Sequence, residues 1–193
     1  GGGGGGGVAV GAQVPDFGAR DWAGEPFELW RDVVGQGRRA LLLFFGPTIT
    51  EEDVREANAA AALVYYANCE LVGVAGCPRT ELAALAARVE VDFALLCDED
   101  GAVSALFGLE GPVASAEWQR LYVVGAQGRL LHQRSAVPGG GSQLMEALTA
   151  VSGSLGDDTA SAAGFRRRRI VQGRAARARR LDAVAGRSRT FTR

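Results

Sequence analysis

The sequence contains no lysine, one histidine and three cysteines, and these scarcities exclude several kinds of site. His132 alone cannot form a multi-histidine metal centre, so we expect no metal, and we interpret it as a solvated strand residue. Cys69, Cys77 and Cys97 are odd in number and widely spaced, which fits neither a disulfide framework nor a zinc-binding pattern. We expect no cofactor either.

Long apolar runs are also missing. The longest strongly apolar stretches are Ala40–Phe45 and Leu71–Ala75, far short of the roughly 20 residues of a membrane-spanning helix. Apolar residues nevertheless make up 47% of the 193 residues, which is enough to fill the core of one domain with tails. We therefore expect a soluble body.

Charge is unevenly distributed along the chain. Residues 1–165 carry 10 of the 21 arginines against 21 of the 22 acids, whereas residues 166–193 carry 11 arginines and only Asp182. An acidic body is thus followed by a strongly basic tail. The use of arginine throughout, with abundant alanine and glycine, is interpreted as the composition of a GC-rich genome.

Hydrophobic periodicity and turn residues predict an alternation of strands and helices. The expected elements are a hairpin over Asp21–Leu29, a strand over Arg39–Phe45, a helix over Thr50–Ala67, a strand over Leu71–Ala75, a helix over Pro78–Val89, a strand over Phe93–Cys97, a brief helix ending near Gly108, a hairpin of Leu121–Val124 with Arg129–Gln133, and a helix over Ser142–Val151. Two β-α-β crossovers followed by a hairpin predict an α/β fold, in which a mixed sheet, parallel at its centre, has helices on both faces.

These patterns divide the chain into four parts. Residues 1–7 form a glycine-rich segment, residues 8–152 the folded domain, residues 153–164 a small-residue linker, and residues 165–193 an arginine-rich extension. Because the first residue is not methionine, we expect either that an N-terminal segment has been removed or that the sequence is incomplete.

Several pieces of the domain, in this order, resemble the peroxiredoxins of the alkyl hydroperoxide reductase/thiol-specific antioxidant (AhpC/TSA) group. The matching pieces are Val14-Pro-Asp-Phe17, Asp21–Leu29, Arg39–Pro47, Leu71–Ala75, Phe93–Gly101 and Arg120–Val124 with the following Gly128. The resemblance covers roughly 140 residues and implies a thioredoxin-like fold.

In that family the reactive cysteine ends the motif Pro-x-x-x-Thr-x-x-Cys. Here Pro47 is followed by Thr50 and Asp53, and no cysteine occurs between residues 46 and 68. The cysteine position falls on Asp53 if one residue is deleted and on Val54 if none is, and neither side chain can be oxidised as a thiolate is.

The residues at this turn favour a helix start over thiol chemistry. Thr50 and Asp53 have the spacing of a capping box, and Glu51 and Glu52 add two more carboxylates to the first helical turn. Those charges would raise the pKa of a nearby thiol. We therefore interpret the site as catalytically degenerate and the domain as a structural or docking subunit of a larger assembly.

Arg120 stands where the family places an arginine near its reactive thiol. It could be a retained peroxide-polarising group, or it could form an ion pair with Glu52 or Asp53 above the strand ends. We favour the ion pair.

A thiol-dependent redox or antioxidant enzyme is the alternative. Cys77 and Cys97 both follow strands joined by one crossover, so the topology can make them neighbours at the edge where open α/β sheets bind ligands. Two buried thiols that fill gaps in the core are the simpler interpretation.

The tail is the other candidate binding element. Its arginines, which would repel each other until an anionic partner is met, include Arg166, Arg167, Arg168, Arg169, Arg174, Arg177, Arg179 and Arg180. Acidic proteins, nucleic acid and membrane headgroups all fit, and an organellar nucleic-acid-associated protein is a further alternative. Protein subunits of a larger complex are favoured as partners. The missing methionine and the composition favour an organelle, a plastid before a mitochondrion.

Overall fold

The computed structural model describes residues 7–46, 48–109 and 119–136. Along the chain the elements are β1 (Gly18–Asp21), β2 (Pro26–Glu28), α1 (Leu29–Asp32), a 3-10 turn η1 (Val34–Gln36), β3 (Arg39–Phe45), α2 (Glu51–Tyr66), β4 (Cys69–Ala75), α3 (Arg79–Arg88), β5 (Ala94–Cys97), α4 (Ala102–Leu106), β6 (Gln119–Val124) and β7 (Leu130–Ala136). The expected helix over residues 142–151 lies outside the described residues, as do residues 1–6 and the parts from 153 onward.

The strands form one mixed sheet in the order β2-β1-β5-β4-β3-β6-β7. β3, β4 and β5 are parallel, while β6 pairs with β3, and β1 with β5, in antiparallel fashion. The α/β fold with a sheet that is parallel at its centre is confirmed.

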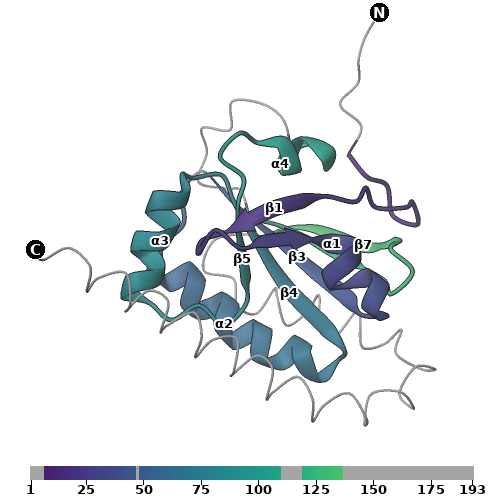
Figure 1. Cartoon of the computed structure of the whole chain (residues 1–193). Helices are drawn as coiled ribbons and strands as arrows, with labels where there is room; N and C mark the ends of the chain where they lie inside the picture. The colour runs from purple at the N-terminus through teal and green to yellow at the C-terminus, as the bar shows by residue number, and fades with distance from the viewer. Residues whose placement is uncertain (1–6, 47, 110–118, 137–193) are drawn as a thin grey trace, which may run out of the picture. The chain divides into compact units, whose positions relative to one another are not determined.

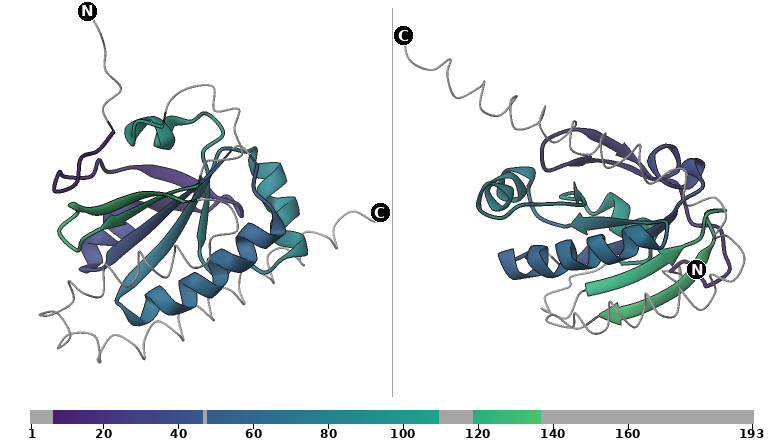
Figure 2. Two further views of the ribbon diagram at one scale, coloured as in Figure 1. Left: turned by 180° about the vertical axis from the view of Figure 1, so that it is seen from behind. Right: turned by 90° about the horizontal axis from the view of Figure 1, so that it is seen from below.

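Helices cover both faces of the sheet. Figure 1 places α4 and α2 on opposite sides of the strands, and Figure 2 shows α2 and α3 together on one face. This follows from the crossovers β3-α2-β4 and β4-α3-β5, which run in the same direction along the sheet and therefore place both helices on the same side.

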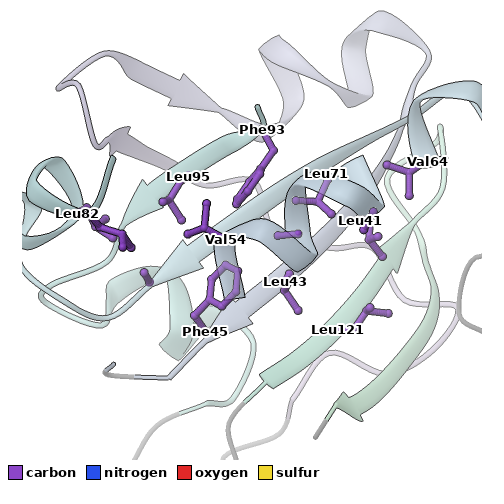
Figure 3. Close-up of a cluster of buried hydrophobic side chains, with 14 of the residues drawn as sticks. Leu41, Leu43, Phe45, Val54, Val64, Leu71, Leu82, Phe93, Leu95 and Leu121 are labelled. Atoms are coloured by element: carbon purple, nitrogen blue, oxygen red, sulfur yellow. The ribbon is translucent and has the colours of Figure 1, made fainter. Parts of the chain in front are cut away.

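Two apolar clusters fill the space between the sheet and its helices. The α2-side cluster includes Leu41, Leu43, Phe45, Val54, Val64, Leu71, Leu82, Phe93, Leu95 and Leu121 (Figure 3). The α4-side cluster includes Val14, Phe17, Leu29, Phe44, Val103, Phe107 and Tyr122. Alternate residues of β3 point to opposite faces, so this fully buried strand contributes to both clusters.

Several expected boundaries were wrong in detail. Leu29 begins α1 rather than ending the first hairpin, because its backbone N–H bonds to the Phe17 carbonyl and its side chain is fully buried. β4 begins at Cys69 rather than Leu71, because its first two residues pair with Arg39 and Ala40 of β3. The last hairpin is longer than expected: β6 begins at Gln119 rather than Leu121 and β7 ends at Ala136 rather than Gln133, because Gln119 pairs with Ala136 and Arg120 with Ser135.

Candidate functional site

The turn between β3 and α2 ends in a complete capping box. The Thr50 hydroxyl oxygen accepts the Asp53 backbone N–H at 3.2 Å. In return, one Asp53 carboxylate oxygen accepts the Thr50 backbone N–H at 2.8 Å and the Thr50 hydroxyl at 2.7 Å. Asp53, one of the two positions that the sequence resemblance predicts for the family's cysteine, is thus engaged in starting the helix. Val54, the other, is fully buried, and Pro47 lies outside the described residues.

Glu51 ties the first turn of α2 to α3. Its carboxylate accepts hydrogen bonds from Arg88 at 3.0 Å and from Arg55 at 2.7 Å. The hydrogen bond from Arg88, joined by that from Arg55, lowers the pKa of Glu51. Because the folded pKa is lowered, this pairing stabilises the fold above the ordinary carboxyl pKa and is lost as the pH falls through the folded value.

Three carboxylates therefore occupy the first turn of α2. A helix N-terminus carries partial positive charge, which favours anions, and here side-chain carboxylates supply the negative charge. A thiol placed among them would be disfavoured as a thiolate, since like charges nearby raise its pKa. The geometry suits helix initiation rather than activation of a nucleophile.

Replacing Thr50 with alanine is expected to lower the free energy of unfolding by about 1 kcal/mol, the usual cost of losing an N-cap. Thr50→Ser keeps the oxygen and is the matched control, with a loss of about 0.5 kcal/mol or less expected. Urea unfolding of both variants measures the difference. Equal losses would show that the Thr50 hydroxyl does not stabilise the helix start.

Arg120 lies on β6 directly opposite Phe44 of β3. Alternation along the strand directs it to the same face as Tyr122, the face opposite α2. Burial raises the pKa of the Tyr122 phenol, and the charge and hydrogen bond of Arg120 partly offset this. This link to Tyr122 was missed in the sequence, although the two-residue spacing on a strand was its signal. The ion pair of Arg120 with Glu52 or Asp53 stays a prediction.

The three cysteines lie in different environments. Cys69 is buried at the start of β4, and burial raises the pKa of its thiol to about 12. Cys77 is buried just after β4, where burial and then the Glu81 carboxylate raise its pKa to about 11. Cys97 is partly exposed at the end of β5 and donates a hydrogen bond to the Cys77 carbonyl, with Sγ and O 3.3 Å apart. The structure thus brings Cys77 and Cys97 together and leaves Cys69 at the other end of β4.

His132 lies on β7 opposite Val123 and is partly buried. Among the described residues, no three histidine, cysteine or acidic side chains are grouped so that they could hold a metal ion. Within the same residues, no helix is both long and apolar enough to span a bilayer. The tail arginines from Arg166 to Arg180 lie outside the described residues.

Comparison with known proteins gives matches over the described domain. The sequence model of the AhpC/TSA family matches residues 10–133. A search of curated proteins found no match.

Solved structures share the fold. Peroxidoxin BcpB from Mycobacterium tuberculosis is 21% identical with a TM-score of 0.62, covering 76% of this chain and 97% of its own. The mitochondrial 2-Cys peroxiredoxin from Plasmodium falciparum is 17% identical with a TM-score of 0.64, covering 76% and 94%. AhpC from Enterococcus faecalis is 17% identical with a TM-score of 0.62, covering 76% and 92%. At these identities the likeness shows the thioredoxin-like fold of peroxiredoxins.

Proposed function

Because the chain belongs to the AhpC/TSA family, we propose that it is a catalytically degenerate peroxiredoxin-like domain that serves as a structural or docking subunit of a larger, organellar assembly, with a plastid favoured. Membership of the family accounts for the fold. The capping box at the start of α2 is the reason to propose a role other than peroxide reduction.

The capping box of Thr50 and Asp53 carries this proposal. Peroxide reduction in this fold needs a thiolate at the start of α2, and residues 46–68 contain no cysteine. The Asp53 carboxylate makes hydrogen bonds of 2.8 and 2.7 Å to Thr50 there, and Glu51 is held by two arginines. These contacts stabilise the helix start and leave no thiol at the position that the family's chemistry requires.

Two of the three remaining thiols, Cys69 and Cys77, are poor substitutes. An efficient nucleophilic cysteine has a lowered pKa and access to solvent. Cys69 and Cys77 are buried and have raised pKa values of about 12 and about 11. Near neutral pH almost all of both thiols is protonated, so attack on a peroxide oxygen would be slow.

The charge distribution supports a docking role. Residues 1–165 have an excess of acids, and residues 166–193 carry 11 arginines against a single acid. A segment of this density of positive charge binds anionic surfaces, with an affinity that falls as salt rises. Aromatic residues are scarce here: Phe165 lies just before this segment, and Phe191 is the one aromatic residue within it. Stacking of nucleic-acid bases on the tail therefore has little support. An acidic protein surface is therefore the favoured partner of the tail.

The tail is tested by replacing eight arginines with glutamine in the full chain. The replaced residues are Arg166, Arg167, Arg168, Arg169, Arg174, Arg177, Arg179 and Arg180. We expect the natural chain to bind poly-glutamate in a salt-dependent way and the glutamine variant to bind it at least tenfold more weakly, roughly the loss of 1.4 kcal/mol or more. Lysine at the same positions keeps the charge and is expected to keep most of the binding.

Single-stranded RNA and vesicles of phosphatidylglycerol are the competing probes in this experiment. Binding of RNA at least tenfold tighter than poly-glutamate, about 1.4 kcal/mol, would replace the protein-docking role with nucleic-acid association. Unchanged poly-glutamate binding by the glutamine variant would remove the tail from the proposal.

A further inference from the structure

Cys77 and Cys97 lie together where two neighbouring parallel strands end. Ala75 of β4 is the register partner of Cys97 of β5, and Cys77 follows Ala75 by two residues. The Cys97 thiol donates to the Cys77 carbonyl oxygen, with Sγ and O 3.3 Å apart. Cys77 belongs to the α2-side cluster, and Cys97 packs against that cluster, so both residues lie on one face of the sheet.

We propose that Cys77 and Cys97 form a reversible disulfide, which makes the pair a thiol–disulfide switch distinct from the family's peroxide-reducing site. Covalent geometry limits the distance between the carbonyl oxygen and Sγ of one cysteine to about 5 Å, so the two sulfurs lie within about 8 Å of each other. Rotation about χ1 from one staggered position to another moves a sulfur by about 3 Å. Rotation of both side chains can shorten the separation of the sulfurs by up to about 6 Å, and the switch requires that this allows a bond of about 2 Å.

The oxidant that this switch requires is a low-molecular-weight disulfide. Cys97 is the partly exposed thiol, so it reacts first. Its thiolate attacks one sulfur of the small disulfide, the S–S bond breaks, and one small thiolate leaves. Cys77 then loses its proton to solvent and attacks Cys97 Sγ, which displaces the second small thiolate. Two cysteine thiols are oxidised to one disulfide, and the small disulfide is reduced to two thiols.

The surroundings of Cys77 favour the disulfide over the thiolate. Strongly oxidising disulfides are those whose reduced form is stabilised as a thiolate. Burial and the Glu81 carboxylate act in the opposite direction on Cys77 and raise its pKa. Formation of the disulfide is slow, because little Cys77 thiolate is present, and a dithiol reductant reopens the bond.

Cys69 provides an internal control. It is buried at the opposite end of β4, about 26 Å along the extended chain from Cys77, and cannot bond to it. Trypsin cuts after arginine, which leaves Cys69 and Cys77 in peptide 56–79 and Cys97 in peptide 89–120. Cys69→Ser makes any link between these peptides unambiguous.

To test this, the folded full chain is incubated with oxidised glutathione, and the remaining free thiols are alkylated. The chain is then digested with trypsin, and the peptide masses are measured by mass spectrometry. We expect peptides 56–79 and 89–120 to be joined, two hydrogens lighter than their sum, in the natural chain and in Cys69→Ser, and to separate after dithiothreitol. Cys77→Ser and Cys97→Ser should each abolish the link. Should Cys69→Ser fold poorly, fragment ions from the natural chain identify the linked cysteine.

Three results would overturn the switch. In the first, Cys77 and Cys97 both remain alkylated. In the second, glutathione stays attached to Cys97 without a link to Cys77. In the third, the disulfide joins two copies of the chain, which non-reducing electrophoresis detects.

Discussion

Replacing Asp98 with alanine is expected to lower the free energy of unfolding by about 3 kcal/mol. Asp98 is only 3% exposed, and its carboxylate accepts three hydrogen bonds from the first turn of α4. They come from the Val103 and Ser104 backbone N–H groups, both at 2.8 Å, and from the Ser104 hydroxyl at 2.6 Å. Alanine would leave these donors without the charged acceptor that holds the turn.

The loss would extend beyond the turn because α4 covers one face of the sheet. Val103 and the following Phe107 fill the α4-side cluster, where the Phe107 ring packs against Phe44 and Tyr122 with centroids 5.0 Å away in each case. Asp98 thus anchors the helix that closes this face.

Asp100→Ala is the matched control for Asp98→Ala. Asp100 is exposed, and its carboxylate accepts the Ala102 backbone N–H at 3.1 Å. Its loss is expected to cost about 0.5 kcal/mol. Urea unfolding followed by circular dichroism measures both variants, and equal losses would contradict the anchoring role of Asp98.

Replacing Gly73 with valine is expected to destabilise the domain by about 3 kcal/mol or more. Gly73 lies in the middle of β4, and a Cβ there would lie 2.7 Å from Phe93 Cε2 and 2.8 Å from Phe45 Cε2. Both rings belong to the α2-side cluster and cannot withdraw without disturbing their neighbours (Figure 3). Phe45 also ends β3, so its displacement would disturb the approach to the turn before α2.

The destabilisation at Gly73 should increase with the size of the new side chain and should be larger than at an exposed glycine. Gly73→Ala adds only the Cβ and is expected to cost about 1–2 kcal/mol. Gly18→Val is the control at an exposed position of β1, where the nearest atom to a Cβ is the Phe27 carbonyl oxygen at 3.3 Å, and about 1 kcal/mol or less is expected. Equal losses in the free energy of unfolding for Gly73→Val and Gly18→Val, measured by chemical denaturation, would contradict this prediction. They would show that the Phe45 and Phe93 rings can move aside without destabilising the domain.

Most of the sheet was predictable from the sequence because its central strands are continuous apolar runs. β3 was expected at its observed bounds, since all seven of its residues are buried. The start of β4 was not visible, because Glu70 interrupts the apolar pattern. Glu70 pairs with buried Arg38, and Arg38 stacks on the Tyr65 ring 5.7 Å away, a contact between distant residues that no local pattern encodes.

The candidate site was predictable where its interactions are local or follow from topology. The capping box depends on residues three positions apart, and the proximity of Cys77 to Cys97 follows from the shared edge of parallel strands. The attachment of Glu51 to Arg88 and the role of Asp98 as an acceptor for α4 were missed. Arg88 is far from Glu51 in sequence, and Asp98 precedes α4 by four residues, outside the usual cap position.

The absence of an activated thiol is the central claim, and peroxide consumption tests it directly. The pure, reduced full chain is mixed with hydrogen peroxide near neutral pH, and the loss of peroxide is compared with that caused by a variant in which Cys69, Cys77 and Cys97 are all serine. We predict equal rates, because the start of α2 carries Thr50 and Asp53 in place of a thiolate. Rapid consumption that requires Cys77 or Cys97 would contradict the account and establish a thiol peroxidase.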